Sequence, residues 1–161
     1  MDLSNLGHAL MARNKRDEAR QCFERALSID EAELGPDHPT VLDRVCDLGA
    51  VLAALGQLEE ALRCFERVLR FDEATVGSDH ANVLVDLTNL VDVLFKLGRD
   101  DEAKRIYLRI ISMLSRSCWS EPSTRRLGFQ RVCGTSNESM WKNQSKAIFE
   151  YLEIEEKKRI L

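Results

Sequence analysis

The chain has 161 residues, of which 44% are apolar and 31% charged, a balance that suits one soluble domain with an apolar core. No apolar run approaches the roughly 20 residues that span a bilayer, and the N-terminus lacks a basic stretch followed by an apolar one, so we expect a cytoplasmic protein without a membrane partner. Residues 1–115 hold 21 Asp and Glu against 14 Lys and Arg, which argues against a nucleic-acid partner, because such surfaces need clustered basic residues.

A pattern with a period of 42 residues occurs three times along the chain. The stretch ARQCFERALSIDEAELG, which begins at Ala19, aligns with ALRCFERVLRFDEATVG from Ala61 and with AKRIYLRIISM from Ala103. The stretches that precede them, LGHALMARNKRDEA, LGAVLAALGQLEEA and LVDVLFKLGRDDEA, align as well. Such a period is typical of helical solenoids, in which each unit buries an apolar face against the next one.

Each unit is predicted to form two helices. In the second unit, the apolar residues of the first helix recur at the spacing of one helical face; they are Val45, Leu48, Gly49 and Leu52. The second helix shows the same spacing with Ala61, Phe65, Val68 and Leu69. Gly56 lies between them and can take the left-handed conformation that ends a helix. The absence of a side chain at Gly49 lets the two helices approach closely.

Two linkers, GPDHPTV from residue 35 and GSDHANV from residue 77, place a His beside an Asp. A metal or catalytic role competes here with a turn between repeats. We favour the turn, because each repeat has one such His and no second His or Cys at ligand spacing. Gly35 and Gly77 are expected to end the preceding helix, and Asp37 and Asp79 to cap the following one.

These residues resemble the tetratricopeptide repeat. The positions that carry the resemblance are Leu3, Leu6, Gly7, Leu10, Ala19, Phe23 and Ala26, then Val45, Leu48, Gly49, Leu52, Ala61, Phe65 and Val68, then Leu87, Leu90, Val91, Leu94, Ala103, Tyr107 and Ile110. The 42-residue period and the GxDHxxV linker are similar to the kinesin light chain variety of this repeat. The resemblance implies an all-α, right-handed solenoid of about three helix-turn-helix units at residues 1–35, 36–77 and 78–115.

The last 46 residues carry no clear repeat. Residues 116–137 are rich in Ser, Thr and Arg and are predicted to form a loop or a disordered linker. Residues 138–161 are predicted to form a C-terminal helix that caps the solenoid. A helix that binds a partner, or a tail that folds back onto the repeats, are the alternatives.

No enzyme is expected from this sequence. The chain has no phosphate-binding glycine loop, no nucleophile motif and no metal-binding motif, so we expect no catalytic residue, no metal and no cofactor. Its five cysteines form no CxxC pair and are interpreted as reduced thiols that pack like small apolar side chains, which favours the cytosol. The resemblance implies instead an adaptor or scaffold that binds protein partners.

The first helix of each repeat is expected to line the concave side of the solenoid. The residues that point to this side are interpreted as a peptide-binding surface, with ordinary solvated polar residues as the alternative; they are Asn5, His8, Asp43, Cys46, Asp47, Ala50, Thr88, Asn89, Asp92, Phe95 and Lys96. Because the surface is acidic, the expected partner is a neutral or basic peptide segment. The competing interpretations are self-association through the repeat ends, where Leu3, Leu6 and Leu10 would be partly exposed, and a fragment of a larger regulatory protein.

Overall fold

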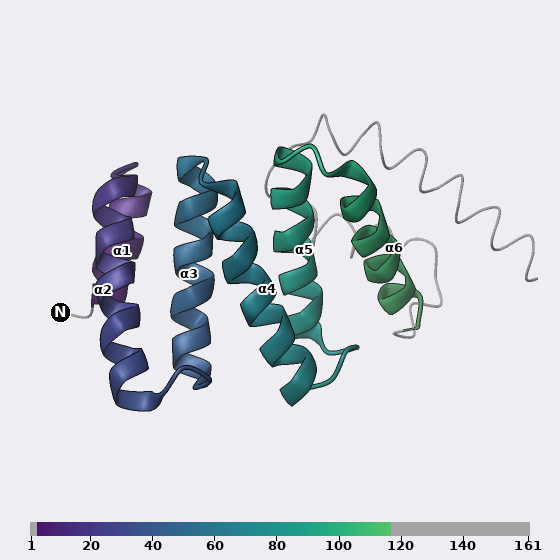
Figure 1. Ribbon diagram of the computed structural model, residues 1–161, viewed down its shortest axis with the longest axis horizontal. Coiled ribbons are helices and arrows are strands. Elements are labelled where there is room, and N and C mark those ends of the chain that lie inside the picture. Colours follow the sequence, from purple (N-terminus) through teal and green to yellow (C-terminus); the bar gives the residue numbers. More distant parts are fainter. Residues whose placement is uncertain (1–2, 117–161) are drawn as a thin grey trace, which may run out of the picture. The chain divides into compact units, whose positions relative to one another are not determined.

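The computed structural model describes residues 3–116, which form an all-α helical-repeat solenoid, as predicted. Six helices follow one another: α1 (Leu3–Ala12), α2 (Arg16–Leu34), α3 (Pro39–Leu55), α4 (Leu58–Thr75), α5 (Ala81–Lys96) and α6 (Asp100–Arg116). Each helix packs against its neighbour in the chain (Figure 1). No strand occurs within this range. The C-terminal helix and nearly all of the linker that were predicted lie outside the described residues.

The core is built from the same positions in each repeat. Ala19, Ala61 and Ala103 are fully buried near the start of the second helices, and an aromatic residue follows one turn later in each unit. These aromatic residues are Phe23, Phe65 and Tyr107, and all are buried. Burying such a ring stabilises the fold by about 1.5–3 kcal/mol. The repeat therefore determines the core, because in each unit it places a small side chain and then a large one where the second helix packs against its neighbours.

Two glycines in the first helices allow close contact with these rings. A Cβ atom at Gly7 would lie 2.6 Å from Cζ of Phe23, and one at Gly49 would lie 3.0 Å from Cε1 of Phe65. Both distances are shorter than ordinary carbon contacts of about 3.5–4.0 Å. The predicted role of Gly49 in close helix approach agrees with this geometry.

The histidines of the two linkers are helix caps, and the prediction that Asp37 and Asp79 cap these helices is wrong. His38 precedes α3 in an extended conformation, and its Nδ1 accepts a hydrogen bond from the backbone N–H of Thr40 at 3.2 Å. His80 makes the equivalent bond at the start of α5. The aspartates stand one residue too early, because the capping side chain must belong to the residue immediately before the first helical one.

Successive second helices are joined by a repeated ion pair that also holds the linker. Arg67 of α4 lies 2.8 Å from a carboxylate oxygen of Glu31 on α2, and donates to the carbonyl oxygen of Pro36 at 2.6 Å. Arg109 of α6 makes the equivalent ion pair with Glu73 of α4. Half-exposed pairs of this kind contribute at most about 1 kcal/mol. Their clearer effect is to fix where the linker enters the next unit.

Candidate functional site

The eleven residues predicted to bind a peptide all lie on α1, α3 and α5, and none is fully buried. We call the surface that they form the first-helix face. Five of its residues are exposed: Asn5, His8, Asp43, Ala50 and Lys96. The other six are partly buried: Cys46, Asp47, Thr88, Asn89, Asp92 and Phe95. Side chains from all three first helices are thus accessible on this face.

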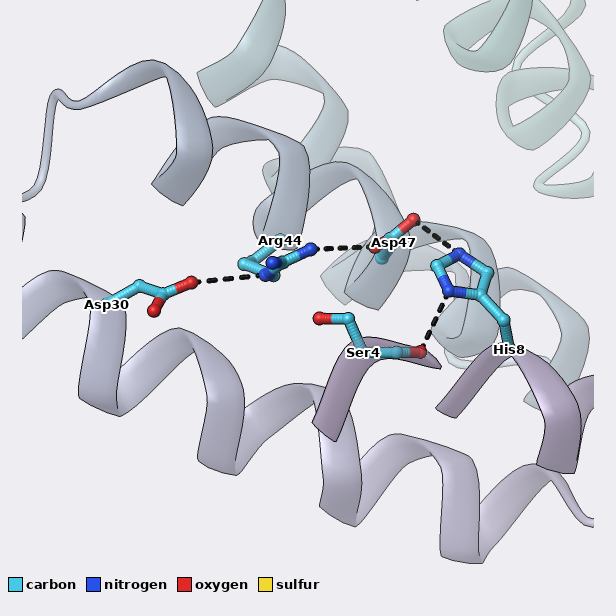
Figure 2. A network of polar contacts seen from close by, with 5 residues as sticks. All are labelled: Ser4, His8, Asp30, Arg44 and Asp47. Atoms are coloured by element: carbon cyan, nitrogen blue, oxygen red, sulfur yellow. Dashed lines mark hydrogen bonds and ion pairs between the residues drawn. The ribbon is translucent and has the colours of Figure 1, made fainter. Parts of the chain in front are cut away.

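Asp47 is not a free carboxylate but the centre of a polar network that joins three helices (Figure 2). Its Oδ1 lies 3.1 Å from Nε2 of His8 on α1, and its Oδ2 lies 3.9 Å from Nη1 of Arg44 on α3. The Nε of Arg44 donates in turn to Asp30 on α2 at 3.1 Å. The side chain of Asp47 keeps 24% of its surface exposed, so a partner could reach it but would meet a carboxylate that is already paired.

His8 is held on its other side as well. Its Nδ1 lies 2.8 Å from the carbonyl oxygen of Ser4, and its ring packs edge-on against Phe23 with the ring centres 5.1 Å apart. Both ring nitrogens face oxygen acceptors, so only a ring with two N–H groups can donate to both. Ser4 itself is buried.

The remaining polar residues of the first-helix face divide into paired and unpaired groups. Lys96 contacts a carboxylate oxygen of Asp92 at 2.6 Å, and Thr88 donates to the carbonyl oxygen of Leu84 at 2.8 Å. The side chains of Asn5, Asp43 and Asn89, by contrast, make no hydrogen bond or ion pair within residues 3–116. Two amides and one carboxylate are therefore available on this face to a ligand.

Burial favours the protonated thiol form of the cysteine on this face. Burial raises the pKa of the Cys46 thiol to about 11, and the charges of Asp86, Asp47 and Asp43 add to this effect. Burial also raises the pKa of Cys64. The thiolate is the reactive form of cysteine, so neither residue is suited to nucleophilic chemistry at neutral pH. Cys46 and Phe95 instead pack against the same apolar cluster.

Neither a metal centre nor a membrane span is found among the described residues. Within residues 3–116, no three His, Cys, Asp or Glu side chains gather closely enough to hold a metal ion. In the same range, no helix combines the length and the apolar content needed to cross a bilayer.

One buried acid was not identified from the sequence. Asp86 of α5 is only 4% exposed, and its Oδ2 has no hydrogen-bond partner within the described part of the chain. Burial raises its pKa to about 7, with smaller contributions from the charges of Asp72 and Glu73. A comparison of charge between repeats could have found it, since Asp86 follows Arg44 by one repeat length and so reverses the charge at that position.

Comparison with known sequences identifies the repeats. Residues 3–74 and 44–116 each match the sequence profile of the tetratricopeptide repeat. The chain belongs to the tetratricopeptide repeat family. No curated protein sequence is significantly similar to this tetratricopeptide repeat chain.

Three solved structures share the fold. A protein described as a kinesin light chain of Podosopora anserina with nearly identical TPR-like repeats is 24% identical, with a TM-score of 0.64 over 73% of this chain and 56% of that one. BtubC (BKLC) from P. vanneervenii is 18% identical, with a TM-score of 0.68 over 82% and 55% of the two chains. The TPR domain of Arabidopsis FLU is 19% identical, with a TM-score of 0.60 over 70% and 92%. The chain thus spans little more than half the length of the first two proteins.

Proposed function

We propose that this tetratricopeptide repeat protein is a non-enzymatic adaptor that binds an extended peptide segment of a partner on the first-helix face. The fold is generally a protein–protein interaction module, and first helices line the concave side of such solenoids. The observation that carries the proposal is the set of unpaired polar side chains on this face, namely Asn5, Asp43 and Asn89. Amides can both donate to and accept from the main chain of an extended peptide.

The same face favours a neutral or basic segment. Asp43 is an exposed acid without an internal cation among the described residues, so a Lys or Arg of the partner would be the natural counter-charge. In the following repeat, Val85 occupies the position equivalent to Asp43 and is 60% exposed. An apolar residue of the peptide could cover Val85, while its main chain bonds to Asn89 one turn later. The segment expected to bind therefore combines a basic residue with an apolar one.

The proposed setting is the cytoplasm. Cys22, Cys46 and Cys64 are all free thiols, which is compatible with a reducing compartment. A scaffold role, in which the chain brings a bound partner close to other proteins, follows from the same binding surface.

An immobilised peptide library tests this function. We expect the protein to retain peptides with basic and apolar residues, and to release them at high salt because the contacts are partly exposed. The Asp43→Lys variant should lose these peptides. Glu33→Lys is the matched control, since Glu33 is an exposed acid of α2 and the substitution changes the net charge equally. Equal loss in both variants would mean that total charge, not the first-helix face, governs retention.

The main alternative is self-association through the repeat ends. Leu3, Leu6 and Leu10 of α1 are only partly buried, so a second solenoid could stack on this helix. A molecular mass that rises with concentration in light scattering, together with no peptide retained from the library, would favour this alternative over peptide binding.

A further inference from the structure

The junction between α4 and α5 differs in charge from the equivalent junction one repeat earlier. Between α2 and α3, the cation of Arg44 lies 3.1 Å from Asp30 and 3.9 Å from Asp47. The residues 42 positions later are Asp72 for Asp30, and Asp86 for Arg44. The later junction therefore keeps a carboxylate, Asp72, at the position of the ion-pair partner of Arg44. It has a second carboxylate, Asp86, at the position of Arg44 itself.

No cation within the described residues compensates for this reversal. Asp86 is buried, and its Oδ2 has no hydrogen-bond partner among residues 3–116. The charged groups that face it are Asp72 and Glu73 of α4, and the thiol of Cys46 on α3 also senses its charge. Arg109 of α6 reaches this junction, but it pairs with Glu73. A buried acid without a partner is costly, and a cation placed beside it would remove that cost.

We propose that Asp72 and Asp86 form a receptor for one arginine side chain of the bound partner, in the place that Arg44 occupies one repeat earlier. Arginine fits better than lysine, because its planar group can donate to two carboxylates at once. This inference rests on the proposed function, since it adds one specific contact to the peptide that the first-helix face receives.

Access to this position is inferred from the equivalent junction and from Asp72, because Asp86 itself is only 4% exposed. In the equivalent junction, the side chains of Arg44 and Asp30 keep 20% and 23% of their surfaces exposed, so the guanidinium group of Arg44 is not sealed inside the core there. Asp72 is likewise only partly buried. Because Arg44 also reaches Asp47 on the first-helix face, the equivalent place should lie at the edge of that face, beside Asn89.

Binding of a cation should be linked to the proton of Asp86. The pKa of Asp86 is raised to about 7, so the group is mostly protonated at pH 6 and mostly ionised at pH 8. A guanidinium group favours the ionised form. We therefore expect an arginine-containing ligand to bind about tenfold more tightly at pH 8 than at pH 6.

The test is a titration of the full chain with a blocked Ala-Arg-Ala tripeptide, observed through the carboxyl carbon resonances of its aspartates. The control ligand is the same tripeptide with citrulline, which has the shape of arginine without its charge. We expect the arginine tripeptide to shift the resonances of Asp86 and Asp72 and to lower the pKa of Asp86, and the citrulline tripeptide to do neither.

Two variants complete the test. Asp86→Asn keeps the shape of the side chain and should abolish the response of Asp72 and the dependence of binding on pH. Asp86→Arg supplies the cation from within and should likewise abolish binding of the arginine tripeptide at this position.

The outcomes separate the receptor from the proposed function. If the arginine tripeptide shifts the resonance of Asp43 but leaves that of Asp86 unmoved, the receptor is refuted while the proposed function stands. If Asp86 responds but the library retains no peptide through the first-helix face, the proposed function fails and the arginine receptor remains. No shift at Asp86 under any condition refutes the receptor.

Discussion

Replacing the buried acid of α5 by its neutral amide should make the protein more stable above neutral pH. In the folded chain the pKa of Asp86 is about 7, against an ordinary value of 3.8. The folded state therefore holds a proton that the unfolded state releases, and the contribution of Asp86 to stability falls as the pH rises from about 4 to about 7. Above that range Asp86 is ionised in both states, and its contribution no longer changes.

The size of the effect follows from the same two values. A difference of about three pKa units corresponds to roughly 4 kcal/mol of folding free energy lost between the two ends of this range. An asparagine side chain cannot ionise, so the Asp86→Asn variant should gain up to this amount over the wild type at pH 8. At pH 4 the two proteins should be nearly equal in stability, because both then carry a neutral side chain at this position.

Urea unfolding followed by circular dichroism measures the effect at pH 4, 6 and 8. Asp43→Asn is the matched control, since Asp43 occupies an exposed position of another first helix; its stability should follow that of the wild type at each pH. The midpoint for Asp86→Asn should move above that of the wild type only as the pH rises. An equal difference between Asp86→Asn and the wild type at pH 4 and pH 8 would refute the assignment of Asp86 as a buried, uncompensated acid.

Three further substitutions test the fold by urea unfolding at a fixed pH. Phe65→Ala should cost about 3–5 kcal/mol, because it empties a core position; a cost below about 1 kcal/mol would contradict its burial. Gly7→Ala should destabilise the fold more than Gly49→Ala. A Cβ at position 7 would lie 2.6 Å from the ring of Phe23, whereas a Cβ at position 49 would lie 3.0 Å from its nearest neighbour, the ring of Phe65; the reverse order would contradict this packing. His38→Ala should cost about 1 kcal/mol through the lost cap, whereas Asp37→Ala should leave stability unchanged.

The solenoid could be predicted from the sequence because its core repeats. The same spacing brings Ala61 and Phe65 to the helix contact in the second unit and Ala103 and Tyr107 in the third, and all four are buried. The glycine at position 49 could be interpreted in the same way, since a residue without a side chain inside a helix indicates a close neighbour. Local rules of this kind suffice where one unit resembles the next.

Contacts between units were harder to predict. Asp47 was expected to be available to a partner, yet His8, which lies 39 residues earlier, contacts it. No spacing within one unit indicates such a pair. Asp86 was missed for a related reason. The alignment of the repeats draws on the positions whose residue type is kept, whereas Asp86 has the charge opposite to that of Arg44 one repeat earlier. Only the fold shows that the charge of Asp72 acts on Asp86.

The central claim, that the first-helix face binds a peptide, is tested most directly by backbone amide chemical shifts of the full chain during titration with a basic peptide retained from the library. We expect the largest shifts at Asn5, Asp43 and Asn89 on α1, α3 and α5, and much smaller shifts along α2, α4 and α6. Shifts confined to the second helices, or to the outer side of α1, would contradict the claim and move the binding surface away from the first-helix face.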